Sequence, residues 1–266
     1  KQIGILTNII TIYFDMILVV GSSFVRHEDY PTWLPLLKTT EEVMEITPPG
    51  AGGDYIARRA IKAILQHKPS TVIIQWTDWS KYSHMYSAPL YPEVLHYLNS
   101  KPADFQKLWK NGLIHSSDDP EDENVQLPRS IRWKNGVWLQ EYLDSITPEV
   151  REKMVVNCIE YNIFNNIIPV QNICEKYKIK LLMFQGFKPF RWFREFKNNW
   201  ISLTDKYLCN LTQQYDQYID MYKFIGWPLY KCGNGFTMSE LVKDKGFVGE
   251  NGFTPNEQGC ELIATY

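Results

Sequence analysis

The 266-residue sequence predicts an α/β fold with a parallel sheet of about five strands. Short apolar runs alternate with segments of helical periodicity, and several of these runs end at glycine or at small polar residues. Such runs are typical of parallel strands that are buried on both faces. A chain of this length with 44% hydrophobic residues can bury a core of its own, and we expect one domain over residues 1–266.

The first half of the sheet follows from two apolar runs and the loops that close them. The run 16–20 is expected as the first strand and 43–47 as the second. The second strand leads into a loop of glycine and proline over 48–53, which has unusual backbone freedom. Asp54 is expected to cap a helix over 55–67, whose apolar residues share one helical face.

The remaining elements continue the alternation of strand and helix. They are expected as strands at 71–76, 178–184 and 224–227, a helix over 147–177 and a final helix after a capping motif at 254–257. Pro169 lies inside the long helix and is expected to kink it, because proline lacks the N–H that the helix needs.

Three segments fall outside this alternation. Residues 1–15 form an extension of uncertain origin, and Met16, which directly precedes the first strand, is a candidate natural start. Residues 80–147 and 187–235 are rich in tyrosine, tryptophan and phenylalanine, and we expect them to be insertions.

Charge and cysteine usage narrow the function classes. The net charge is −2, so nucleic-acid binding has little electrostatic support. No run is long and apolar enough for a transmembrane helix, and we expect no membrane partner and a cytoplasmic location, that of the host cell if the protein is viral. The five cysteines show neither zinc-ligand spacing nor a disulfide framework, so we expect free thiols, no metal and no cofactor.

Four polar pieces are expected at one edge of the predicted sheet. They are a serine pair after the first strand, a glycine loop after the second, a polar cluster after the third, and a proline–asparagine turn before the last helix. Because the carboxyl ends of parallel strands face the same crevice, all four pieces should meet at one site.

The order and spacing of these pieces resemble the SGNH (GDSL-type) hydrolases, in particular divergent versions common in phage and marine sequences. The resemblance extends from about Met16 to the end of the chain. It implies a flavodoxin-like three-layer sandwich. It also implies a serine ester hydrolase that acts on a small-molecule or carbohydrate ester, for example by deacetylation.

The first three blocks of the family assign roles to particular residues. The sequence Gly-Ser-Ser-Phe over 21–24 places Ser23 at the nucleophile position. Gly53 matches the glycine whose N–H points into the oxyanion hole. Thr77 stands where the family has an asparagine, and its hydroxyl can still donate one hydrogen bond.

The last block keeps its frame but not its catalytic side chains. Asn251 stands where the family has aspartate and Thr254 where it has histidine, and threonine cannot serve as a general base near neutral pH. A replacement base must come from elsewhere, and His27 and His84 are the alternatives.

Two function classes therefore stay open from the sequence. The first is a serine esterase or acetylhydrolase with Ser23 as nucleophile. The second is a non-catalytic domain of the same fold that binds a glycan or a protein, since fold and function separate readily.

Overall fold

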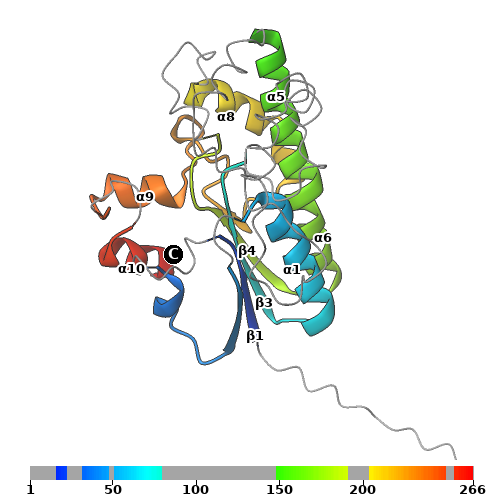
Figure 1. The fold of residues 1–266 in the computed structure, drawn as a ribbon, viewed down its shortest axis with the longest axis vertical. Coiled ribbons are helices and arrows are strands. Elements are labelled where there is room, and N and C mark those ends of the chain that lie inside the picture. Colours follow the sequence, from blue (N-terminus) through cyan, green and yellow to red (C-terminus); the bar gives the residue numbers. More distant parts are fainter. Residues whose placement is uncertain are drawn as a thin grey trace, which may run out of the picture.

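The protein has three layers, with a sheet between two sets of helices (Figure 1). The computed structural model describes residues 16–22, 32–47, 51–79, 148–190, 204–249 and 255–265. Its sheet has five parallel strands in the order β2-β1-β3-β4-β5. The predicted α/β class with a five-stranded parallel sheet is confirmed.

The strands lie close to where the sequence predicts them. They are β1 (Met16–Val20), β2 (Glu42–Ile46), β3 (Thr71–Trp76), β4 (Lys180–Gln185) and β5 (Phe224–Ile225). β1 and β3 match their predicted bounds, while β2 and β4 are shifted by one or two residues. The segment 1–15 lies outside the described residues.

Alternate residues of the strands belong to separate cores on the two faces of the sheet. Leu18 and Val20 pack on the side of α1 (Gly53–His67), whereas Ile17 and Val19 pack against the helices α9 (Met238–Asp244) and α10 (Glu257–Thr265). Figure 1 shows α1 on one side of the sheet and α9 and α10 on the other. The apolar strand sequences follow from burial on both faces.

Helix α1 begins two residues earlier than an N-cap at Asp54 would require. Gly52 is its N-cap, and the N–H of Ile56 donates to the Gly52 carbonyl at 3.1 Å. The expectation that Asp54 caps the helix is therefore wrong, because this residue already lies in the first turn. An acidic side chain is still favourable there, near the positive end of the helix dipole.

The long predicted helix is present but is interrupted before its proline. It consists of α5 (Pro148–Tyr161), a π-helix η4 (Asn162–Ile167) and α6 (Ile168–Lys176). Pro169 stands in the first turn of α6. The wider π-helical turns precede it, and such turns occur frequently at functional sites.

The described part of the second predicted insertion contains regular structure. In chain order, β5 is preceded by α8 (Asp205–Gln213) and the short 3-10 turn η5 (Asp216–Tyr218), and it is followed by the 3-10 turn η6 (Lys231–Gly233). A further 3-10 turn, η1 (Leu34–Leu36), lies between β1 and β2. No helix in the described ranges is long and apolar enough to cross a membrane.

Candidate functional site

The candidate site is the carboxyl edge of the sheet between β1 and β3. From β1 the chain continues to β2 on one side, and from β3 it continues to β4 on the other. In sheets of this order, ligands bind in the crevice at this switch point. The strand ends are level there, since Val20 pairs with Ile74 and the N–H of Gly186 donates to the Trp76 carbonyl at 2.9 Å.

Gln75 connects β3 to the chain that leaves β1. This side chain is 1% exposed and accepts a hydrogen bond from the Trp33 indole N–H at 2.9 Å. Its amide nitrogen donates to the Ser22 hydroxyl at 3.4 Å. Because Ser22 is also buried, this contact fixes the last described residue before Ser23.

Gln185 repeats this arrangement at the end of β4. It is fully buried and accepts from the Trp79 indole N–H at 3.2 Å, while its amide nitrogen donates to the Thr77 carbonyl. Gly186 follows it, and a Cβ at that position would lie 3.0 Å from the amide nitrogen of Gln75. The two glutamines therefore hold the ends of β1, β3 and β4 in one arrangement.

Gly53 occupies the first position of α1 and faces the π-helix. A Cβ at this glycine would lie 2.8 Å from Asn162 Oδ1, so the close approach needs glycine. Asn162 also donates to the Trp79 carbonyl at 3.0 Å, which joins the start of α1 to the loop after β3. The Gly53 N–H makes no hydrogen bond to any described residue, as the first N–H groups of a helix have no partner within it.

Thr77 lies directly after β3 and has a buried side-chain hydroxyl. The residue is 1% exposed, and its Oγ1 has no hydrogen-bond partner in the described part of the chain. A buried polar atom without a hydrogen-bond partner lowers the free energy of unfolding by about 1–3 kcal/mol. Such atoms are therefore rare in folded proteins, and a functional role is one explanation for them. Within the described ranges, Thr77 and Gly53 thus each carry a polar group that makes no hydrogen bond.

Several predicted residues cannot be placed at this edge. Ser23, His27, His84, Asn251 and Thr254 lie outside the described residues. His67 is the only histidine in the described ranges, and it ends α1 at the opposite end from Gly53. A 15-residue helix spans about 22 Å, so His67 cannot act at this edge.

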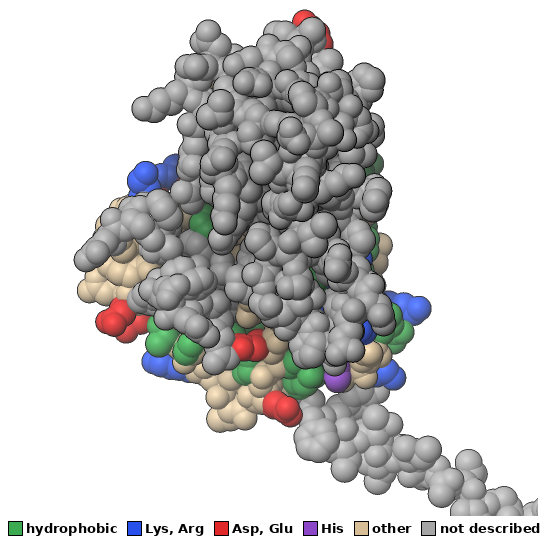
Figure 2. Space-filling view, viewed as in Figure 1, with side chains coloured by type: hydrophobic (Ala, Val, Ile, Leu, Met, Phe, Trp, Pro, Cys, Tyr) green, Lys and Arg blue, Asp and Glu red, His purple; other side chains and the backbone are tan. Residues whose placement is uncertain are grey.

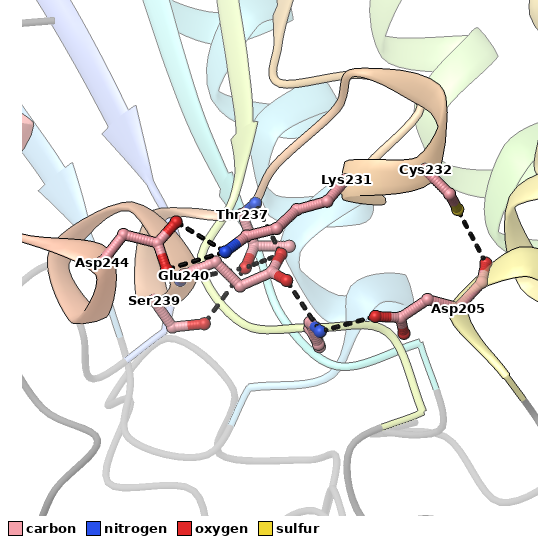
Figure 3. Close-up of polar contacts among 8 residues, drawn as sticks. Asp205, Lys231, Cys232, Thr237, Ser239, Glu240 and Asp244 are labelled. Carbon is pink, nitrogen blue, oxygen red and sulfur yellow. Dashed lines mark hydrogen bonds and ion pairs between the residues drawn. The ribbon is translucent and has the colours of Figure 1, made fainter.

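An ion-pair cluster connects the chain after β4 to α8 and α9. Lys188 Nζ lies 3.0 Å from Asp205 and 2.7 Å from Glu240, and Figure 3 shows Glu240 beside its capping partner Thr237. Burial lowers the pKa of Lys188, but hydrogen bonds to Glu240 and Asp205 raise it by more, so the pKa stands above its usual value. Lys188 therefore stays protonated and cannot replace the missing base.

No cluster of histidine, cysteine, aspartate or glutamate among the described residues could hold a metal ion. Figure 2 shows described side chains of both charges on the visible face.

Four residues that organise the edge were not predicted from the sequence. Gln75 and Gln185 are polar residues at the ends of otherwise apolar strands, and this position was a usable signal. Asn162 and Asn166 lie one helical turn apart within a largely apolar helix and bond to each other at 3.1 Å. A buried amide pair on one helical face was a second usable signal.

No protein-family model matches the sequence, and no curated protein matches it significantly. Among solved structures, the chain is similar to TesA, with 11% identity, a TM-score of 0.38, and coverage of 94% of each chain. It is also similar to a lipase/acylhydrolase from Enterococcus faecalis, at 14% identity and a TM-score of 0.41, over 94% of this chain and 91% of the other. A GDSL-like lipase from Bacteroides thetaiotaomicron is similar at 12% identity and a TM-score of 0.41, over 94% and 84%.

At 10–14% identity and TM-scores near 0.4, the likeness by itself assigns neither an activity nor a substrate to this chain.

The contact between Trp33 and Gln75 can be tested by a double-mutant cycle. Gln75→Leu leaves the Trp33 indole N–H buried without its acceptor, and we expect it to lower the free energy of unfolding by about 1–3 kcal/mol. Trp33→Phe/Gln75→Leu should cost clearly less than the sum of the single changes, measured by urea unfolding. Strict additivity would show that this hydrogen bond does not stabilise the edge.

Proposed function

We propose that the protein is a serine ester hydrolase whose reaction takes place at the carboxyl edge of β1 and β3. The observation that carries the proposal is that neither the buried Thr77 hydroxyl nor the Gly53 N–H has a hydrogen-bond partner among the described residues. Both groups suit the stabilisation of negative charge that develops on a carbonyl oxygen during acyl transfer.

Ser23 is the proposed nucleophile. It follows Ser22, whose hydroxyl is held by Gln75 at the end of the neighbouring strand. The Ser23 hydroxyl would attack the ester carbonyl, its proton would pass to a base, and the alcohol would leave from the acyl-enzyme. Water would then release the acid and regenerate the serine.

The base for this reaction is one of two histidines. Position 254 is a threonine, and Lys188 is paired with two carboxylates. Asp78 is engaged by the N–H of Phe190 at 3.2 Å. These observations support His27 and His84 as the candidates, and separate glutamine variants of each assign the role by loss of rate.

The proposed substrate is a small acyl ester, with an acetylated carbohydrate as one form. Aromatic side chains gather near the edge, where Trp79 contacts Phe190 and Trp227 with ring centroids 6.2 and 6.3 Å apart. These three rings are buried in the hydrophobic core, so they would support an apolar site at this edge from beneath.

The role of Ser23 can be tested with p-nitrophenyl acetate. We expect Ser23→Ala to lower kcat by at least about 10³-fold, because removal of a catalytic serine leaves only the oxyanion hole and binding. The matched control is Ser70→Ala, since Ser70 bonds to the Met16 carbonyl at the opposite edge of the sheet. Equal rates for wild type and Ser23→Ala would exclude catalysis by Ser23 and favour a non-catalytic glycan- or protein-binding domain.

The role of Thr77 has its own test. Thr77→Val removes the hydroxyl while keeping the shape, and we expect kcat to fall by roughly 10²-fold with little change in KM, as for other oxyanion-hole donors. Thr77→Ser keeps a hydroxyl and should retain most of the rate. If valine and serine behave alike, the Thr77 hydroxyl does not contribute to the reaction.

A further inference from the structure

Two cysteines from separate elements lie against each other away from the strand ends. Cys209 lies within α8 and is 2% exposed, whereas Cys232 in η6 is exposed to solvent. Next to Cys232, a Cβ on Gly233 would lie 2.7 Å from Cys209 Sγ. The sulfur of Cys209 therefore packs directly against the backbone that carries Cys232.

The environment of Cys209 includes the Cys232 thiol. Burial raises the pKa of Cys209 to about 11, and the nearby Cys232 thiol raises it further. Cys232 Sγ in addition donates to the Asp205 carbonyl at 3.3 Å (Figure 3). Both sulfurs are free thiols in this structure, one accessible and one buried behind it.

The other cysteines lack this combination. Cys158, Cys174 and Cys260 are all buried and belong to α5, α6 and α10. Burial raises the pKa of Cys174 to about 12 and that of Cys260 to about 11, as it does for Cys209, so none of these three buried thiols is expected to react first with an external oxidant. Since the thiolate is the reactive form and must be accessible, Cys232 is the expected point of attack among the five.

We propose that Cys209 and Cys232 form a redox-modification site that reacts with a low-molecular-weight disulfide such as oxidised glutathione. The Cys232 thiolate attacks one sulfur of the oxidant and releases one glutathione thiol, leaving a mixed disulfide on Cys232. Cys209 then loses its proton and attacks the Cys232 sulfur, which releases the second glutathione. The protein loses two hydrogens to become a disulfide, and oxidised glutathione becomes two reduced molecules.

The new bond would join α8 to η6 beside the ion-pair cluster. Asp205, the first residue of α8, accepts from Cys232 through its carbonyl and pairs with Lys188 through its carboxylate. A disulfide constrains the unfolded chain across the segment that contains η5 and β5, and this raises the thermal midpoint of unfolding. The site needs no catalytic activity, so it stands independently of the proposed hydrolase function.

The experiment oxidises the reduced full-length protein in glutathione buffers of increasing oxidising strength. Free thiols are then alkylated, and the protein is digested and analysed by mass spectrometry. We expect a peptide linked through Cys209 and Cys232, a loss of two hydrogens from the intact mass, and a Tm increase of roughly 5–10 °C.

Two variants make the test specific. Cys232→Ser, at an exposed position, should abolish both the linked peptide and the Tm increase, whereas Cys260→Ser should retain them. A persistent glutathione adduct on Cys232 without the link would overturn the proposal. So would a Tm increase in Cys232→Ser equal to that of the wild type.

Discussion

The arrangement of the candidate site depends on the need of two buried amide side chains for hydrogen bonds. Gln75 is the last but one residue of β3 and Gln185 the last residue of β4. Each accepts a hydrogen bond from a tryptophan indole and donates one to a segment that leaves the sheet. An unpaired amide inside a protein is costly, so these contacts fix where the chain after β1 and the chain after β3 can run. Thr77 and the residue preceding Ser23 are both held by them.

Much of the fold could be predicted from the sequence because β1 and β3, in the middle of the sheet, are almost fully buried. Their runs are almost entirely apolar and are closed by small or polar residues, so their bounds were clear, whereas the edge strand β2 is more exposed. The N-cap of α1 was less predictable, because aspartate and glycine are both favoured at this position. In the structure the N-cap is Gly52. The π-helix before Pro169 was missed, since its position depends on packing against Gly53 rather than on propensity.

The candidate site was predictable only in part, for a physical reason. Topology brings the strand ends together, and Gly53 and Thr77 do lie at the same edge through their contacts with Asn162 and Gln185. The side chains that hold the site residues in place, such as Gln185 and Asn162, come from distant parts of the chain. A single sequence does not indicate which buried amide side chain will bond to which loop. Ser23, His27, His84, Asn251 and Thr254 remain predictions, because they lie outside the described residues.

The proposed site combines Ser23 after β1 with the Gly53 N–H at the start of α1 and the Thr77 hydroxyl after β3, neither of which has a hydrogen-bond partner among the described residues. A fluorophosphonate, which phosphonylates activated serines, tests this combination most directly when the adduct is located by mass spectrometry. We expect one adduct per chain, on Ser23. An unmodified protein, or an adduct on a different residue, would contradict catalysis by Ser23.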